Sequence, residues 1–363
     1  MPDNKNQHFI PQMYLRRFSA NGKSVGLINL KTEKIIENAP IKRQCSKSYY
    51  YGKNPDESVF VTSEGLGHQL DELEKSVLPR VRSREHVMIL HLILTMYSRS
   101  EHYRASVAES EKAMLESMLD NSEISEQDIA ILRKTISQKG HISKILMAQE
   151  GYPICVDLQM GVFVNHSNIE FITSDNPVVV YNPLMCDSTI GTHNGIGSRG
   201  IVFLLPITHR VVFVLYDNTS YKSSANGGVY KLKRPFDIQI LNALTVLSAE
   251  ENVYFFSDSN SAAITVRQYG HKRRKIKGNV IVQSSDEYSS FGIYKEPIRE
   301  KIMIPGLKIK HSARVSKRKY KKKGDLKAKY LRNPELVRQS ELFNRRVTKG
   351  EYNWYEFEKY LIL

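Results

Sequence analysis

Apolar residues recur every three or four positions in the first half of the chain, and this spacing is typical of amphipathic helices. The clearest stretch is 64–82, where Ser63 provides a suitable N-cap. Residues 85–119 keep the pattern with no glycine or proline inside, which predicts one long core helix or two consecutive helices. With shorter helices after them, these segments predict a helical block over about 63–150.

From about 152 to 257 the pattern changes to short runs of β-branched and aromatic residues bounded by turn residues. Such runs, among them Ile154–Leu158 and Val211–Tyr216, predict a mainly antiparallel sheet, and residues 235–249 return to a helix. An earlier β-hairpin is expected over 25–36. Because helices fill one block and strands another, the sequence predicts an α+β fold in which the two blocks pack together.

The apolar periodicity fades after Ile304 and returns as a cluster of aromatic and aliphatic residues from Tyr352 to Ile362. We therefore expect an α+β body over 1–300 and a basic C-terminal module over 301–363 that ends in an aromatic helix. If this helix docks on the body, its role is structural. If it is exposed, it would bind a partner, because a contiguous apolar patch is unusual on a monomer.

The composition is that of a globular protein, since 41% of the 363 residues are hydrophobic and 25% are charged, which excludes a disordered or collagen-like chain. The longest apolar run, Val87–Met96, is far shorter than the ~20 residues of a membrane-spanning helix. The polar N-terminus lacks the apolar segment of a signal peptide, so we expect a cytoplasmic protein. Three cysteines without a Cys-x-x-Cys pair predict reduced, buried thiols.

Positive charge is concentrated at one end of the chain. Residues 1–266 carry 27 basic and 28 acidic side chains, whereas residues 267–349 carry 25 and 7. Like charges this dense repel one another unless a polyanion neutralises them, and phosphate contacts release counterions from nucleic acid. We therefore predict DNA or RNA as the partner of 267–349, with a solubilising tail or an arm for an acidic protein as alternatives. The candidate contacts are Lys272, Arg273, Arg274, Lys317, Arg318, Lys319, Lys321, Lys322 and Lys323.

A first polar motif occupies the N-terminal run Asn6–Phe18, which is polar just before a predicted short helix and amphipathic within it. His8 can titrate near neutrality, act as a base or bind a metal. Arg16 can hold a phosphate in a bidentate grip. The structural alternative is that Gln7 and His8 cap the helix and tie the N-terminus to the body.

A second polar motif, Thr173–Pro177, lies between two apolar runs. An acid and two hydroxyls at the end of a strand suit a Mg²⁺ or phosphate site, because hard cations take oxygen ligands. Asp175 and Asn176 carry this chemistry. The alternative is an ordinary Asx turn followed by proline.

These two motifs, Asn-Gln-His-Phe-Ile-Pro-Gln near the N-terminus and Thr-Ser-Asp-Asn-Pro later, resemble the hallmark motifs of a bacterial family classified as a domain of unknown function, DUF4238. By order and spacing the resemblance covers roughly residues 5–260. It implies a bacterial cytoplasmic protein without an established activity, and it does not extend to the basic tail after residue 300. The shared polar residues that it implies are His8, Asp175 and Asn176.

A neutral body with two polar motifs and a polycationic extension suggests a nucleic-acid-directed protein. The leading hypothesis is a metal-assisted nuclease of bacterial anti-phage defence, with Asp175 as a Mg²⁺ ligand and Asp157 or Glu170 as the second carboxylate. The rival hypothesis is a non-catalytic module that binds nucleic acid or protein, and a third is an enzyme acting on a small phosphorylated substrate. The candidate catalytic residues are His8, Arg16, Asp175 and Asn176, with Arg99 as a second arginine for the phosphate.

Overall fold

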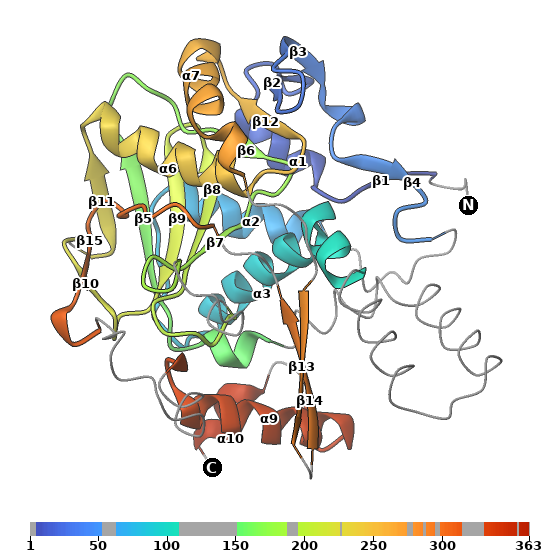
Figure 1. Cartoon of the computed structure of the whole chain (residues 1–363), viewed down its shortest axis with the longest axis vertical. Helices are drawn as coiled ribbons and strands as arrows, with labels where there is room; N and C mark the ends of the chain where they lie inside the picture. The colour runs from blue at the N-terminus through green and yellow to red at the C-terminus, as the bar shows by residue number, and fades with distance from the viewer. Residues whose placement is uncertain are drawn as a thin grey trace.

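The fold is known from a computed structural model that describes ten stretches of the chain (Figure 1). They are residues 5–52, 63–108, 151–186, 195–225, 227–273, 279–285, 288–294, 298–313, 330–353 and 356–362. Within them the chain has an α+β fold with mostly antiparallel strands, as the sequence predicted. The part of the predicted helical block after residue 108 lies outside the described residues.

The helices and strands of the described residues have the following bounds. The α-helices are α1 (Gln12–Leu15), α2 (Ser63–Glu74), α3 (Arg84–Arg99), α6 (Pro235–Ser248), α7 (Ser259–Tyr269), α9 (Pro334–Thr348) and α10 (Phe357–Ile362). Short 3-10 helices are η1 (Arg16–Phe18), η2 (Ile41–Arg43), η4 (Tyr152–Cys155), η6 (Gly270–Lys272) and η7 (His311–Ala313). The strands are β1 (Asn6–His8), β2 (Ser24–Asn29), β3 (Ile35–Pro40), β4 (Ser46–Ser48), β5 (Gln159–Asn165), β6 (Thr173–Ser174), β7 (Val179–Tyr181), β8 (Val202–Thr208), β9 (Val211–Tyr216), β10 (Tyr221–Ser223), β11 (Val229–Leu232), β12 (Asn252–Phe255), β13 (Asn279–Ser285), β14 (Tyr288–Tyr294) and β15 (Leu307–Ile309).

A five-stranded sheet in the order β11-β5-β9-β8-β7 forms the centre of the body, and its neighbouring strands are antiparallel except for the parallel pair β11 and β5. Side chains of β9 alternate between two cores. Phe213 and Leu215 join the core that contains α3, whereas Val212 and Val214 join the core that contains α6. Because both faces are covered, the central strands are apolar throughout instead of alternating with polar residues.

A four-stranded antiparallel sheet, β3-β2-β12-β6, lies beside the central sheet and places the second polar motif. In β12, Val253 is paired with Ser174 and Tyr254 with Thr173. The same strand pairs on its other side with β2 of the predicted hairpin. The short strand β6 therefore brings the Thr-Ser-Asp-Asn-Pro motif next to the turn that connects α6 to β12.

The long helical segment expected over 85–119 is interrupted at Ser100. Helix α3 ends at Arg99, Ser100 has an extended ψ of 149°, and helix resumes over 101–108. The Ser100 hydroxyl donates to the Tyr97 carbonyl (2.8 Å) and accepts from the Tyr103 N–H (3.2 Å), so it satisfies backbone groups on both sides of the break. Of the two alternatives predicted for this segment, one long helix or two consecutive helices, the structure has two consecutive helices.

The strand expected over Ile154–Leu158 was wrong. These residues form the end of η4 and a turn, and Cys155 and Leu158 are buried there. Pro153 lies in the first turn of η4, where its missing N–H and fixed φ are tolerated. A short apolar run has the same composition in a buried strand and in a buried helical turn, so periodicity could not separate the two.

The aromatic C-terminus packs on the body. The Phe357 N–H donates to the Tyr152 hydroxyl of η4 (3.3 Å), and the two rings meet edge to face with centroids 6.3 Å apart. The ring of Phe343 in α9 also meets that of Phe357 edge to face, with centroids 5.1 Å apart. These C-terminal aromatic residues are therefore docked on the body, which is the structural role expected of a docked helix. Cys45, Cys155 and Cys186 are buried free thiols, as predicted, and the described stretches contain no helix that is long and apolar enough to span a bilayer.

Candidate functional site

Asp175 follows β6 and is almost fully buried, and its carboxylate is bound by the backbone of the turn after α6. Oδ1 accepts from the Glu250 N–H (2.9 Å), and Oδ2 accepts from the N–H groups of Glu251 (2.7 Å) and Asn252 (2.9 Å). Burial raises the pKa of Asp175 from 3.8 to about 6, against the three N–H groups, which favour the charged form. The carboxylate thus holds the turn between α6 and β12 and titrates within reach of neutral pH.

Asn176 is buried in the core and attaches the second motif to the end of helix α6. Its Nδ2 donates to the carbonyl (2.8 Å) and the hydroxyl (3.0 Å) of Ser248, the last residue of α6. The Asn176 N–H donates to the Ser174 hydroxyl (3.1 Å), which is a serine turn and not the expected Asx turn, because the Asp175 carboxylate binds the turn after α6 instead. The Asn176 Oδ1 is buried without a hydrogen-bond partner, which is uncommon for a polar atom inside a protein.

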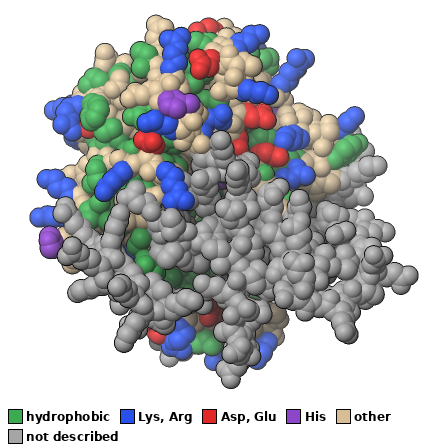
Figure 2. Space-filling view, in the orientation of Figure 1, with side chains coloured by type: hydrophobic (Ala, Val, Ile, Leu, Met, Phe, Trp, Pro, Cys, Tyr) green, Lys and Arg blue, Asp and Glu red, His purple; other side chains and the backbone are tan. Residues whose placement is uncertain are grey.

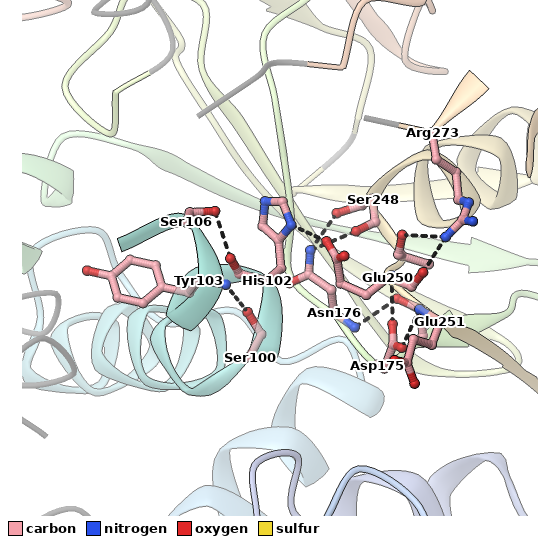
Figure 3. A network of polar contacts seen from close by, with 12 residues as sticks. Ser100, His102, Tyr103, Ser106, Asp175, Asn176, Ser248, Glu250, Glu251 and Arg273 are labelled. Carbon is pink, nitrogen blue, oxygen red and sulfur yellow. Dashed lines mark hydrogen bonds and ion pairs between the residues drawn. The ribbon is translucent and has the colours of Figure 1, made fainter. Parts of the chain in front are cut away.

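Glu250 connects this turn to two other parts of the chain (Figure 3). Its side chain is hydrogen-bonded to Nδ1 of His102, which is 3% exposed and lies on the helical segment 101–108. The Glu250 carbonyl accepts from the guanidinium of Arg273, at the start of the basic region. Sequence patterns did not single out His102 or Glu250, because a lone histidine and a lone glutamate on unrelated elements carry no local signal.

The N-terminal motif is built into a small antiparallel pair of strands, β1 and β4. Gln7 is buried, its Oε1 accepts from the Tyr51 N–H (2.6 Å), and its Nε2 donates to the Gly52 carbonyl (2.8 Å). These bonds tie the N-terminus to the body, as the structural alternative expected, whereas helix α1 has no side-chain cap, so the capping role expected of Gln7 and His8 is wrong.

Both ring nitrogens of His8 are engaged. Nδ1 lies 3.1 Å from the carbonyl of Gln44 and therefore donates to it, while Nε2 accepts from the side-chain amide of Gln12 (3.0 Å). The Gln12 Oε1 in turn accepts from Arg16 (3.3 Å). Burial lowers the pKa of His8, and the charges of Arg99 and Arg16 lower it further against the bond to Gln44. His8 is thus a neutral imidazole at neutral pH and would have to leave Gln12 to act as a base.

The two motifs are connected through Tyr14 and through the segment that contains Arg99, the second arginine predicted for the phosphate, and His102. The Tyr14 hydroxyl is 2.7 Å from Oγ1 of Thr173 and donates to the Pro206 carbonyl (2.6 Å), so it joins the first motif to the second. Arg99 donates to the His8 carbonyl (2.9 Å), and three residues later His102 binds Glu250. Three Cα–Cα steps span at most about 11 Å, so the segment 99–102 contacts the first motif at His8 and, at Glu250, the turn that Asp175 of the second motif holds.

The carboxylates proposed as Mg²⁺ ligands have other partners in the described structure. Asp157 forms an ion pair with Arg332 (2.8 Å), whose side chain is 1% exposed. Glu170 accepts from the hydroxyl (2.7 Å) and N–H (2.9 Å) of Ser257. The described stretches hold no group of three or more His, Cys, Asp or Glu side chains that could bind a metal ion. Asp157, Glu170 and Asp175, with these partners, do not fit a Mg²⁺ site in the described structure.

Two of the basic residues predicted to contact nucleic acid are described. Lys272 lies 3.4 Å from a carboxylate oxygen of Glu300, and Arg273 donates to the carbonyl of Gly270 (2.9 Å) as well as to that of Glu250. Arg273 therefore anchors the backbone where the basic region begins. The others, Arg274, Lys317, Arg318, Lys319, Lys321, Lys322 and Lys323, lie outside the described residues.

Comparison with known proteins identifies the family. Residues 6–259 match the model of the family described as "Protein of unknown function (DUF4238)", and the chain belongs to this family. The matched range contains both polar motifs and ends before the basic region. No curated protein and no solved structure matches the chain.

Proposed function

We propose that this protein binds the phosphate backbone of nucleic acid through residues 267–349. The observation that carries the proposal is the charge distribution, with 25 basic and 7 acidic side chains in this range against 27 and 28 in residues 1–266. Each ammonium or guanidinium that meets a phosphate releases counterions, so affinity from this source is independent of sequence and falls with salt.

The contacts of the body support this proposal because they anchor the basic region 267–349 at Arg273, near its start, and at Arg332, after its densest run. On the N-terminal side Arg273 binds the turn that Asp175 holds, through the carbonyl of Glu250. On the C-terminal side Arg332 is buried against Asp157 and donates to the carbonyl of Ile196 (3.1 Å). A segment that is fixed at both ends loses less conformational entropy on binding than a free tail does.

The contacts of Arg332 and of the C-terminal aromatic helix with the body make truncation an unsuitable test of the proposal. Removing residues after 300 would strip Arg332 and the aromatic helix from the body, so charge neutralisation is preferable to truncation. The test variant changes Lys319, Lys321, Lys322 and Lys323 to Gln. The matched control changes the same number of exposed lysines in the body, namely Lys23, Lys31, Lys34 and Lys42.

Binding to labelled single-stranded and duplex DNA and RNA is measured by fluorescence anisotropy for the wild type and both variants. We expect the wild type and the control to bind alike and the test variant to bind more weakly to every oligonucleotide. Absence of wild-type binding at low salt, or equal losses in the two variants, would contradict the proposal.

A second candidate function is nucleic-acid cleavage, as in a nuclease of bacterial anti-phage defence. The observation in its favour is that Arg99 binds the first motif, while His102, three residues later, binds Glu250 in the turn that Asp175 of the second motif holds. The discriminating measurement is the product pattern on denaturing gels, with Mg²⁺ or with a chelator, for the wild type and for His8→Ala. Fragments that require His8 would favour the nuclease, whereas intact oligonucleotide in every lane would leave binding as the function.

A further inference from the structure

The strands β10 and β15 form a two-stranded antiparallel ribbon in which two lysines lie directly opposite each other. The register pairs Lys222 with Lys308, and both side chains are exposed. Their neighbours Tyr221 and Leu307 are buried, so one face of the ribbon covers the core and the other presents the two ammonium groups.

Such a pair is unfavourable in the free protein. Directly opposite residues in an antiparallel pair have Cβ atoms about 4.5–5.5 Å apart, and like charges at this position destabilise the sheet. Neither lysine forms an ion pair within the described part of the chain. The described stretches 195–225 and 298–313 contain two acidic residues, and both have other partners: Asp217 binds Ser220 (2.5 Å), and Glu300 pairs with Lys272.

Further basic groups extend this face. Lys310 is exposed two residues after Lys308, and its Nζ donates to the Asn218 carbonyl (2.6 Å). The guanidinium of Arg199 reaches the Ser312 carbonyl nearby (3.2 Å). Figure 2 shows Lys and Arg side chains at the left edge of the molecule, the side on which Figure 1 draws β10 and β15, as well as along the upper and right edges.

We propose that this basic face, formed by Lys222, Lys308 and Lys310, is a binding site for the phosphates of a nucleic-acid strand. The inference rests on the proposed function and extends the interface onto the folded body, because Lys222 lies outside residues 267–349. A phosphate between Lys222 and Lys308 converts their repulsion into two attractions. Lys308 and Lys310 are two positions apart, about 6.6 Å in an extended chain, which is close to two steps of the ~3.4 Å axial spacing between phosphates on one strand of a duplex.

Two variants of Lys222 test separately its repulsion from Lys308 and its contact with a phosphate. Lys222→Glu places an acid opposite Lys308 and should raise the melting temperature of the free protein, because a cross-strand ion pair replaces a repulsion. Lys222→Ala should weaken binding to single-stranded RNA and DNA of any sequence and lower the slope of log K against log salt by about 0.7, the value for one phosphate contact on a single strand. Lys34→Glu and Lys34→Ala, at an exposed lysine of the β2–β3 turn, are the matched controls and should change neither quantity.

The outcomes distinguish this inference from the proposed function. If the wild type binds oligonucleotides and Lys222→Ala binds equally well with the same salt slope, the inference is overturned and the proposed function stands. If the wild type binds no oligonucleotide, the proposed function fails, and binding to phosphatidylserine vesicles in its place would assign the face to a membrane and overturn the inference. A lower melting temperature for Lys222→Glu would contradict the opposed charge pair itself.

Discussion

The carboxyl of Asp175 is subject to two opposing effects, and the pH dependence of stability shows which is larger. Burial disfavours the carboxylate, whereas the N–H groups of Glu250, Glu251 and Asn252 favour it. Burial prevails, and the pKa rises from 3.8 to about 6. Asp175→Asn is the appropriate perturbation because asparagine keeps the size of the side chain and one acceptor oxygen but cannot titrate.

Proton binding determines whether the free energy of unfolding rises or falls with pH. Because the native pKa lies above the unfolded value, the folded protein binds more protons than the unfolded chain between about pH 4 and pH 6. The contribution of Asp175 to the free energy of unfolding is therefore fully present below pH 4 and is lost as the pH rises through 6. A shift of about two units at about 1.4 kcal/mol per unit corresponds to about 3 kcal/mol. This is a large part of the stability of an ordinary domain.

The assay is urea denaturation, followed by far-UV circular dichroism, of the wild type and Asp175→Asn from pH 4 to pH 8. We expect the wild-type free energy of unfolding, relative to that of the variant, to fall by up to about 3 kcal/mol between pH 4 and pH 6 and to stay constant above pH 7. A difference that rises with pH would mean that the three N–H groups outweigh burial. A difference independent of pH would refute the reasoning altogether.

Two further substitutions test the contacts that join the motifs and the C-terminus to the body. Tyr14→Phe removes the hydroxyl between Thr173 and the Pro206 carbonyl, and we expect a loss of about 1–3 kcal/mol in urea unfolding; unchanged stability would show that this contact is dispensable. Arg332→Ala leaves Asp157 without its buried partner and should cost about 3–5 kcal/mol. It should also make the C-terminal region more sensitive to limited proteolysis, and wild-type resistance would contradict the anchoring role.

The parts of the fold that the sequence predicted are those determined by local pattern. The apolar run Val211–Tyr216 forms β9, and residues 235–249 form α6, because each has the length and composition of one element. The interruption at Ser100 was left open, since a serine in a helical pattern can end a helix or remain exposed within it. The run Ile154–Leu158 was misread because its burial, and not its periodicity, determines its structure.

The candidate site depends on contacts between residues far apart in the chain, which no local pattern can reveal. Tyr14 reaches Thr173 across 159 positions, and Arg332 reaches Asp157 across 175. The Thr-Ser-Asp-Asn-Pro motif was identified as polar and turn-forming, but its sequence is the same whether Asp175 faces a ligand or, as here, three backbone N–H groups.

The measurement that tests the central claim most directly is the salt dependence of nucleic-acid affinity. Anisotropy titrations of the wild type with a labelled single-stranded RNA between 50 and 300 mM salt give the slope of log K against log salt. If residues 267–349 hold the phosphate backbone, the slope is steep, and neutralising Lys319, Lys321, Lys322 and Lys323 lowers it by about 3, at about 0.7 per phosphate contact. A shallow slope that the four substitutions leave unchanged would contradict the account.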